Sequence, residues 1–456
     1  MHFIGIDLGT SFVKGAVLDL ETRAIAHVRR RPFPGPLAGL PDGRFEIDPQ
    51  AVVAAARDLL DELGRIAPGC AGMVLCSQMH SLVLADARGR PLSNAITWRD
   101  GRSLDPHPAG GTFFEQLEQR VTPDERLALG NELRPGLPIG ALFWLAEQRE
   151  LPANAVALAL PDFVLGRLCG AGPVSEPTIA AAQGLLDLTT GDWHRPLLER
   201  LGLGKLRWPA IADVRQPVGE VPIGGQAAPC YPGVGDQQCA LVGAALRPGE
   251  LSLNISTGSQ VSRLRDRLAF GDYQVRPFFD GRWLNTITHI PAGRALALLV
   301  DLLAELATAQ GLDVPDPWAY VARAVAATPA TDLRVDLAFF ASALGDRGAI
   351  ANMREGNLTV GHLFRAAFER MAESYLACAL RLAPERDWGR LVFSGGLAQG
   401  MPALRESILR RFDADSRVCP AAEDALHGLL TLALVCAGRA ASVEQAASLA
   451  APAGHI

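Results

Sequence analysis

The sequence predicts a mixed α/β protein with two related halves, in which helices cover β-sheets. Short β-branched or apolar runs bounded by Gly, Asp and Asn alternate with Ala- and Leu-rich stretches of helical period. The chain has 456 residues, about three times the size at which single cores are commonest, which favours two or three domains. A block containing an acid and glycines occurs near the N-terminus and again after Cys230. The repetition predicts a duplicated architecture with a cleft between the halves.

The first block is predicted to be a glycine-bent hairpin, with strands at 3–7 and 13–18 and a polar break at 8–11. An acid at a strand end, Asp7, can hold a hydrated Mg²⁺. Backbone and hydroxyl donors at the tip, with one nearby cation, can bind phosphate oxygens. These candidates are Gly9, Thr10, Ser11 and Lys14. An ordinary β-turn explains the same residues, so the pattern alone leaves both interpretations open.

Helices are predicted where apolar residues recur at helical spacing between Pro and Gly breaks. The predicted helices are 49–66, 140–150, 294–310, 360–382, 402–412 and 425–437. The Pro and Gly at 248 and 249 end a short helical stretch that reaches Leu246. We therefore predict a domain boundary there, with one domain at 1–246 and the other at 247–456.

The second block starts at 231–236 and continues through a strand at 251–255, a polar break at 256–259 and residues 260–262. Asp236 follows two glycines that allow close backbone approach, which suits a carboxylate aimed at a substrate hydroxyl. An Asp N-cap after a Gly-rich turn explains it equally well. The hydroxyl-rich tip at 254–260 could bind phosphate oxygens or form a surface turn.

A buried strand at 391–394 ends in Gly395 and Gly396, before a helix. A glycine pair lets a flat ring lie against the backbone, so a nucleotide base fits there. A tight connection between a strand and a helix fits equally well.

Composition limits the functional classes. The hydrophobic share is 49%, and 43 Lys and Arg face 49 Asp and Glu for a net charge of −6, which gives no electrostatic basis for binding nucleic acid. The eight cysteines lack the two-residue spacing of zinc or redox motifs. An acid lies within the first apolar segment, and the longest uncharged apolar stretch, 428–438, is too short to span a membrane. We expect a soluble cytoplasmic protein with no membrane partner.

The order of these features resembles the actin, hexokinase and heat-shock chaperone superfamily, in which two ribonuclease H-like domains bind ATP in the cleft between them. Two further segments resemble the sugar-site motifs of FGGY carbohydrate kinases, notably xylulokinases and sedoheptulokinases. They are Gln78-Met79-His80, after a strand at 72–76, and the run at 97–103. Gly348, Ile350 and the segment 362–369 resemble the C-terminal signature of the same family. The resemblance runs from residue 4 to about residue 430.

A sugar presents hydroxyls at its edges and C–H groups on its faces, so its site needs polar groups beside an apolar platform. The candidate polar groups are Gln78, His80, Asp100 and Arg102, and the candidate platform is Met79 with Trp98. Taken singly, each residue also has a structural explanation, such as a turn or a core side chain.

The resemblance implies an ATP-dependent sugar kinase with the actin-like ATPase fold and its active site in the interdomain cleft. It implies that Asp236 is the base that accepts the proton of a terminal primary hydroxyl, with Gln237 beside the sugar. Asp7 would organise Mg²⁺ on the phosphates of ATP. The second domain would supply most of the nucleotide site, through Thr257, Gly258, Gly293, Gly395, Gly396 and Gln399. Sugar and ATP are then the expected partners, and a homodimer is left open.

Three positions depart from the family pattern. A Lys that many members carry is absent from 140–144, a usual glycine is Asn352, and Gln399-Gly400 replaces a polar residue near the adenine. Sedoheptulokinases also lack the Lys, and Met79-His80 stands where glycerol kinases have an Arg-Glu pair. We therefore expect a ketose, sedoheptulose or xylulose, as the acceptor. The alternatives are a kinase of another sugar or polyol, of the ribulose, gluconate or erythritol type, a non-catalytic actin-like nucleotide-binding protein, and a sugar sensor.

Overall fold

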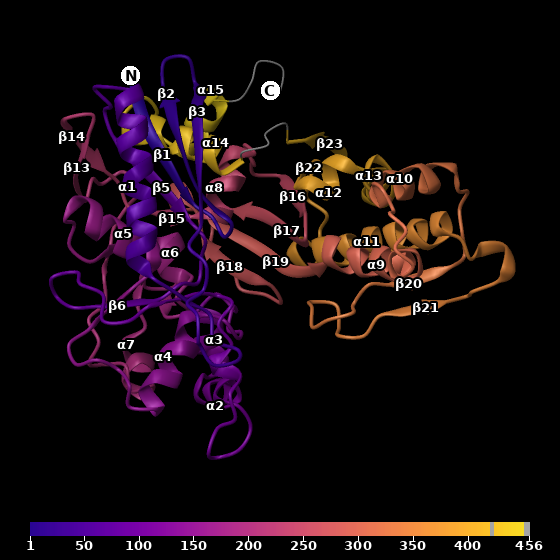
Figure 1. Cartoon of the computed structure of the whole chain (residues 1–456), viewed down its shortest axis with the longest axis horizontal. Helices are drawn as coiled ribbons and strands as arrows, with labels where there is room; N and C mark the ends of the chain where they lie inside the picture. Colours follow the sequence, from indigo (N-terminus) through magenta and orange to yellow (C-terminus); the bar gives the residue numbers. More distant parts are fainter. Residues whose placement is uncertain (420–423, 451–456) are drawn as a thin grey trace.

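The computed structural model describes residues 1–419 and 424–450, which form two lobes, each built around one large β-sheet (Figure 1). The first lobe also carries a group of short helices and strands at one end, labelled α2, α3, α4 and α7 in Figure 1. The alternation of apolar strands and helices in the sequence thus yields the mixed α/β class that it predicts.

Within the described residues, seven strands form the first sheet, in the order β13-β14-β5-β1-β2-β3 with β15 beside β5. β1 pairs with β2 in antiparallel fashion and with β5 in parallel fashion. The strands are β1 (His2–Leu8), β2 (Phe12–Asp19), β3 (Ala24–Pro32), β5 (Met73–Ser77), β13 (Gly219–Ile223), β14 (Gln226–Cys230) and β15 (Val234–Gly235).

The second sheet repeats this pairing with six strands of the described chain, in the order β18-β19-β17-β16-β22-β23. β16 is antiparallel to β17 and parallel to β22, as β1 is to β2 and β5. The strands are β16 (Glu250–Ile255), β17 (Gly258–Arg265), β18 (Gln274–Pro277), β19 (Trp283–Pro291), β22 (Arg390–Ser394) and β23 (Asp415–Val418). The duplicated architecture is confirmed: the predicted break at 256–259 joins the antiparallel strands β16 and β17, while 234–235 forms β15 and the predicted helical stretch that follows is a helix at 236–243.

Helices cover the sheets on both faces. Alternate residues of β1, β2 and β5 pack under α1 (Pro49–Ile66) and α5 (Leu160–Cys169) on one face, and under α14 (Asp424–Cys436) and α15 (Val443–Ala450) on the other. The second sheet packs against α9 (Gly293–Ala309), α10 (Pro317–Ala327), α11 (Val360–Leu382) and α13 (Pro402–Phe412). α8 (Asp236–Gly243) contributes to cores on both sides, so it joins the lobes.

The small helices and strands of the first lobe have a core of their own, between the β5 region and β18. They are β6 (Val83–Ala85), β7 (Ala95–Ile96), α2 (Phe113–Arg120), α3 (Pro123–Ala128), α4 (Pro138–Glu147), β8 (Val156–Leu158), β9 (Val174–Ser175), α6 (Pro177–Ala181), β10 (Leu186–Asp187), β11 (Asp192–Trp193), α7 (Arg195–Arg200) and β12 (Ala210–Ile211). The remaining short elements are β4 (Glu46–Ile47), β20 (Arg334–Asp336), β21 (Ala349–Ala351), α12 (Gly396–Gly400) and single 3₁₀ turns at Arg102–Leu104, Phe279–Gly281 and Glu355–Asn357.

All six predicted helices are present, three with the predicted bounds. α1 begins where the Asp48 side chain accepts a hydrogen bond from the backbone of Gln50, and α11 begins where Thr359 does the same for His362. α4 begins two residues earlier than predicted because Pro138 occupies its first turn.

The last two described helices return to the first lobe. α14 and α15, yellow in Figure 1, lie beside the first sheet and α8, while the other late elements form the second lobe. α8 and α14 cross at two glycines: a Cβ on Gly243 would lie 2.0 Å from Asp424 O, and one on Gly428 1.9 Å from Cys239 O. The domain boundary between residues 246 and 247 stays a prediction. Residues 424–450 lie after that boundary in the sequence but pack against the first lobe. Over the described residues, no helix combines the length and apolarity that a membrane span requires.

Candidate active site

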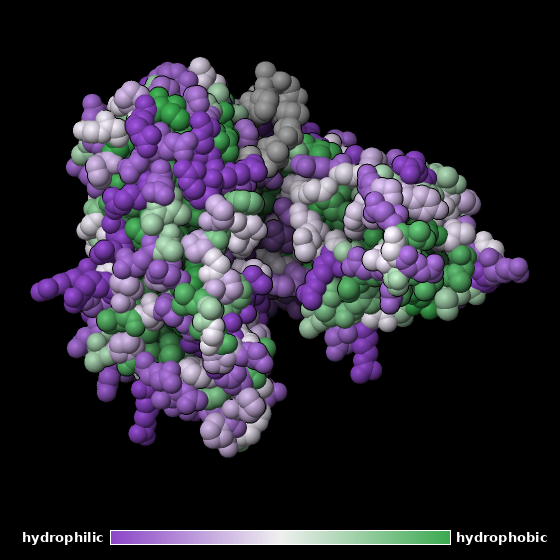
Figure 2. Space-filling model, in the orientation of Figure 1, coloured by the Kyte–Doolittle hydropathy of each residue, from purple (hydrophilic) through white to green (hydrophobic). Residues whose placement is uncertain are grey.

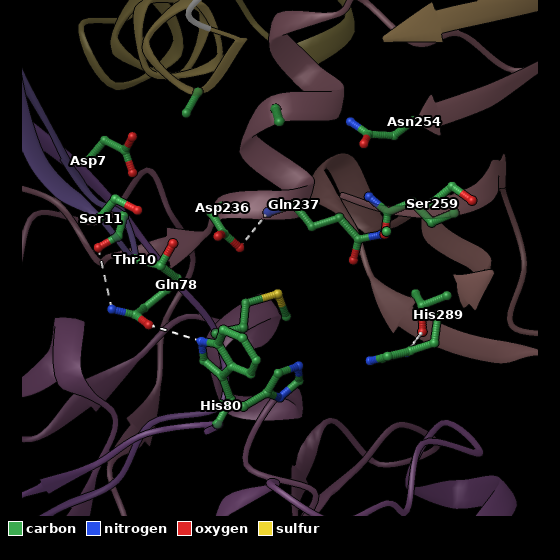
Figure 3. Close-up of a pocket in the computed structure, with 18 of the residues that line it drawn as sticks. Asp7, Thr10, Ser11, Gln78, His80, Asp236, Gln237, Asn254, Ser259 and His289 are labelled. Atoms are coloured by element: carbon green, nitrogen blue, oxygen red, sulfur yellow. Dashed lines mark hydrogen bonds between the residues drawn. The ribbon is translucent and has the colours of Figure 1, made fainter. Parts of the chain in front are cut away.

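A cavity of about 750 Å³ lies between the two sheets and is lined from both lobes. Figure 2 shows the molecule hollowed between the lobes, and Figure 3 shows the side chains that face one another across the cavity. The lining residues predicted from sequence are Asp7, Gly9, Thr10, Ser11, Lys14, Gln78, Met79, His80, Trp98, Asp236, Gln237 and Gly258. Asn254, Ser259 and Gln260, from the predicted tip at 254–260, line it as well. The lining residues that the sequence did not indicate are Phe12, Arg134, Ala240, Arg276, Thr288, His289 and Ala425.

Asp7 lies near the end of β1, opposite Lys14 in the hairpin. The turn is tight, since the backbone NH of Gly9 donates to Phe12 O at 3.1 Å and a Cβ on Gly9 would lie 3.1 Å from the same oxygen. Thr10 and Ser11 are exposed at its tip. The hairpin therefore presents one carboxylate and two hydroxyls to the cavity (Figure 3).

Asp236 is the first residue of α8, and its Oδ1 accepts from the backbone NH of Gln237 at 2.8 Å. The two preceding glycines lie in tight surroundings, because a Cβ on Gly233 would lie 2.8 Å from Pro161 Cβ and one on Gly235 2.6 Å from the Gln238 amide oxygen. Burial, and then the charge of Asp7, raises the pKa of Asp236 to about 7. A carboxyl with a pKa near neutrality, at a helix start and facing a cavity, is suited to proton transfer.

Gln78, Met79 and Trp98 form a side of the cavity next to Asp236. The Gln78 amide donates to Gly9 O at 3.4 Å and accepts from the Trp98 indole NH at 3.2 Å, which ties the phosphate hairpin to the sugar segment. Trp98 leaves 44% of its surface exposed, so it offers an apolar face to a ligand.

His80 also lines the cavity, but both of its ring nitrogens are engaged. Nδ1 lies 2.9 Å from Ala182 O, and Nε2 lies 2.9 Å from Nη2 of Arg134. A carbonyl only accepts and a guanidinium only donates, so the proton is on Nδ1 and Nε2 is the acceptor. Burial, and then the Arg134 charge, lowers the pKa of His80 to about 3, so the ring is neutral. His80 therefore holds Arg134 in place, and both of its ring nitrogens are already engaged within the protein.

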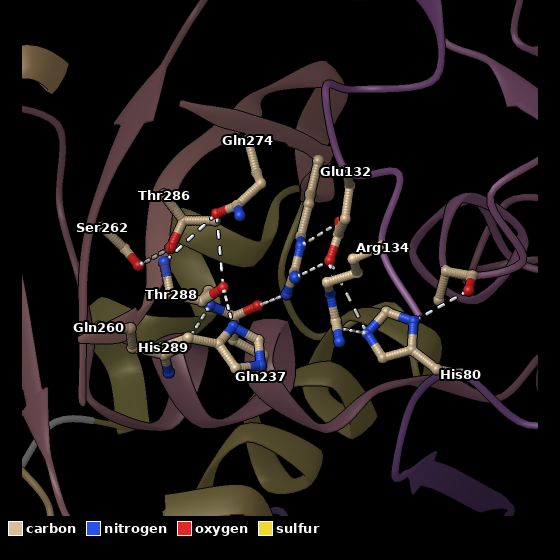
Figure 4. A network of polar contacts seen from close by, with 12 residues as sticks. His80, Glu132, Arg134, Gln237, Gln260, Ser262, Gln274, Thr286, Thr288 and His289 are labelled. Carbon is tan, nitrogen blue, oxygen red and sulfur yellow. Dashed lines mark hydrogen bonds and ion pairs between the residues drawn. The ribbon is translucent and has the colours of Figure 1, made fainter. Parts of the chain in front are cut away.

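Arg134 belongs to a buried polar network that local sequence patterns do not predict (Figure 4). Arg276, on β18, forms a two-bonded ion pair with Glu132, in which Nε donates to Oε2 at 2.8 Å and Nη2 to Oε1. Its third nitrogen donates to the Gln237 amide oxygen, and Gln237 in turn donates to Gln260 at 2.9 Å. Burial raises the pKa of Glu132, but the charge of Arg276, and then that of Arg134, outweighs it and lowers the pKa of this carboxyl to about 2.

Asp100 and Arg102, predicted as sugar contacts, do not line this cavity. Arg102 donates to Asp100 at 2.7 Å and to Glu46 at 2.5 Å, and Asp100 also accepts from the backbone NH of Phe45 at 2.8 Å. Both side chains are buried beside a small void next to His80. They brace the loop that presents Trp98.

Several predicted nucleotide contacts do not line the cavity, and Thr257, Gly396 and Gln399 among them are exposed. Thr257, Gly293, Gly395, Gly396 and Gln399 are outside its lining. A Cβ on Gly293 would lie 2.6 Å from Ser256 O, and one on Gly395, where φ is 87°, would lie 2.5 Å from Ile255 O. The Gln399 amide donates to Cys419 O at 3.1 Å. Gly293 and Gly395 thus let the chain pack closely at the strand ends of the second sheet, where α9 begins at Gly293 and α12 at Gly396.

The acid end of the cavity has donors that suit Mg²⁺. Across residues 1–419 and 424–450, no cluster of three or more His, Cys, Asp or Glu side chains forms a closed metal site. Mg²⁺ does not require one, because it commonly keeps several waters and binds through one or two carboxylates together with substrate phosphates. The Asp7 carboxylate, with Asp236 facing the same cavity, fits that kind of site.

Comparisons with known proteins find matches over most of the chain. Residues 2–243 match the N-terminal domain of the FGGY family of carbohydrate kinases. The chain is 25% identical over 461 residues to a sedoheptulokinase of Mus musculus, covering 90% of this chain and 92% of the relative. It is 27% identical over 428 residues to a xylulose kinase of Streptomyces coelicolor, covering 89% and 82%.

Solved structures of xylulose kinases have the same fold. The ligand-bound enzyme from Lactobacillus acidophilus aligns with a TM-score of 0.84 at 20% identity, covering 98% of this chain and 91% of that one. The enzyme from Rhodospirillum rubrum aligns with a TM-score of 0.85 at 21% identity, covering 98% and 92%.

Proposed function

Because the chain belongs to the FGGY family of carbohydrate kinases, and is thus a sugar kinase, we propose that it transfers the γ-phosphate of ATP to the terminal primary hydroxyl of a ketose. The observation that carries the proposal is that Asp7 and Asp236 face one interlobe cavity together with the polar and apolar groups that a sugar needs. Sedoheptulose and xylulose are the favoured acceptors.

Asp236 is proposed as the base. Its position at the start of α8 holds the carboxylate at the cavity, and its raised pKa makes it a stronger proton acceptor than an exposed aspartate. The hydroxyl would place its oxygen in line with the γ-phosphate while its proton passes to an Asp236 oxygen. Phosphoryl transfer depends mainly on such positioning and on charge stabilisation.

The phosphates are proposed to lie at the hairpins of the two lobes. Gly9, Thr10 and Ser11 supply donors from β1–β2, Thr257 and Gly258 from β16–β17, and Lys14 adds a positive charge. Asp7 would hold Mg²⁺, which would offset the negative charge of the phosphates when bound. Gly293, Gly395, Gly396 and Gln399, which lie outside the cavity lining, are proposed to form the nucleotide side of the site.

The ketose preference is supported by the relatives named sedoheptulokinase and xylulose kinase, which match about nine-tenths of this chain. The Met79-His80 pair supports the preference as well. Met79 adds apolar surface at a position where a small triol would need polar contacts. Asp100 and Arg102 are proposed to contribute indirectly, by fixing the loop of Trp98.

A coupled assay of ADP release tests the proposal. ATP and Mg²⁺ are supplied with panels of ketoses, aldoses, polyols and sugar acids, and the phosphorylated carbon of each product is located by NMR. We expect at least one ketose to raise ADP release by about 100-fold or more over ATP alone. The kinase proposal fails if no acceptor raises it, and the ketose proposal fails if ketoses are poorer acceptors than every other class.

A further inference from the structure

We propose that Arg134 is the specificity-determining contact at the His80 end of the cavity, where it selects an acceptor carrying a carbonyl or carboxylate oxygen over one carrying only hydroxyls. The inference rests on the proposed kinase function and names the group by which that site recognises its acceptor.

The charges at this end of the cavity are unbalanced. Two guanidinium groups, Arg134 and Arg276, share the single carboxylate of Glu132. Arg276 binds both carboxylate oxygens, while Arg134 approaches Oε1 only to 3.6 Å. His80 is neutral, so it contributes no charge. One positive charge is thus left with weak compensation, and it belongs to Arg134.

Arg134 is also the member of this network that a ligand can reach. The side chains of Glu132, Arg276 and His80 expose only 7%, 5% and 9% of their surface, whereas that of Arg134 exposes 25% and lines the cavity. Its Nε is buried and has no hydrogen-bond partner among the described residues. The protein itself therefore leaves this guanidinium incompletely satisfied, which is costly for a buried charge. A ligand cannot reach the buried Nε, but it can bind the part of the side chain that is exposed to the cavity.

The network offers donors to a ligand, while each of its acceptors already receives a hydrogen bond from an arginine. The Glu132 oxygens and the Gln237 amide oxygen accept from Arg276, and His80 Nε2 accepts from Arg134. A sugar hydroxyl placed here would have to share one of these acceptors with an arginine to place its own hydrogen. A ketone carbonyl or a carboxylate carries no such hydrogen and accepts from a guanidinium without loss.

His289 does not change this balance. It faces the cavity from β19, and its Nδ1 lies 2.8 Å from the Thr288 hydroxyl. Burial, and then the charges of Arg134 and Arg276, lowers its pKa to about 4, so it is neutral near pH 7 as well. The excess positive charge remains on the guanidinium.

The test compares acceptors of equal length that differ in one group, for a five-carbon acceptor xylulose, xylitol and xylonate. We expect Arg134→Gln to lower kcat/KM for the carbonyl or carboxylate acceptor by about 10- to 100-fold, because a hydrogen bond to a charged group is lost, and to lower it for the polyol by less than about 3-fold. If Arg134 recognises a ketone, xylulose is the best substrate of the wild-type enzyme. If Arg134 recognises a carboxylate, xylonate is the best substrate, and its kcat/KM falls as the salt concentration rises.

Arg88→Gln, in an exposed turn of the same lobe, is the matched control and should leave all three values unchanged. Titration with an ATP analogue checks that Arg134→Gln is folded. Should that variant fail to fold, Arg134→Lys keeps the charge without the guanidinium fork and should show the same acceptor-selective loss to a smaller degree.

Equal losses for all three acceptors, or a wild-type preference for xylitol, would overturn the role of Arg134 while leaving the kinase function intact. Failure of every acceptor in the ADP-release screen would instead remove the proposed function itself, so the two failures can be told apart.

Discussion

The carboxylate of Asp236 is proposed to accept one proton in each catalytic cycle. The amide of an asparagine at this position cannot accept it. We expect Asp236→Asn to lower kcat by about 100-fold or more, with ATP-analogue and sugar affinities within about threefold of the wild type. Steady-state ADP release and calorimetric titration measure the two quantities. Asp313→Asn, on an exposed loop of the second lobe, is the control. Near-normal turnover of Asp236→Asn would show that another group accepts the proton.

The raised pKa of Asp236 predicts the direction of the pH dependence. Burial and Asp7 favour the protonated carboxyl, so Asp236 stays protonated up to a pH of about 7 and becomes the required carboxylate only above it. We therefore expect kcat/KM to rise with pH through about 7 and then to level off, since this ratio reports the free enzyme. A profile measured from pH 5 to 9 checks this. A flat profile over pH 5 to 7 would contradict the base role or the raised pKa.

Single residues could be predicted from sequence where a local pattern marks them. Asp7 and Asp236 stand next to glycines at the ends of strands, and both line the cavity. Arg276 and Glu132 are 144 positions apart and have no motif around them, so only the fold brings them together. Asp100 and Arg102 follow the right motif, but a carboxylate 56 positions before Arg102 holds them in the loop.

Elements were predictable where capping residues mark their ends. α1 and α13 begin with a proline in the first turn, and α1 and α11 have side-chain N-caps, so periodicity and caps agree on the bounds. Two-residue strand β15 could not be found in this way. It depends on pairing with β5, far away in sequence, and Val234–Gly235 has no alternating pattern of its own.

The crossing of α8 and α14 allows no side chain at Gly428. A Cβ there would lie 1.9 Å from the backbone oxygen of Cys239, and backbone cannot move aside cheaply. We expect Gly428→Ala to destabilise the protein by about 3 kcal/mol, at the upper end of the usual cost of overpacking. Chemical denaturation measures it.

Gly166→Ala on α5 is the matched control, because a Cβ there meets only ordinary contact at 3.5 Å. That change should be neutral or stabilise the helix by up to about 1 kcal/mol. Equal effects of the two substitutions would contradict the tight crossing.

At the scale of the whole molecule, the interlobe cavity predicts closure on ligands. Because its lining comes from both sheets, a sugar and a nucleotide bound together contact both lobes and should draw them nearer. We expect small-angle scattering to show a smaller radius of gyration with an acceptor and a non-hydrolysable ATP analogue together than with either alone. ATP hydrolysis without acceptor should be about 100-fold slower than transfer, since closure excludes water. Fast hydrolysis without acceptor, or an unchanged radius, would contradict coupled closure.

The return of α14 and α15 to the first sheet also determines the order in which this protein can mature during synthesis. The face of β1, β2 and β5 that these helices cover includes Phe3, Leu18 and Val74, all made early in translation. The two helices are translated only after the whole second lobe. Until they leave the ribosome, α8 and the residues before it give this apolar face only part of its cover, and the rest is open to aggregation or to chaperones. The first lobe to be synthesised is thus the last to complete its core.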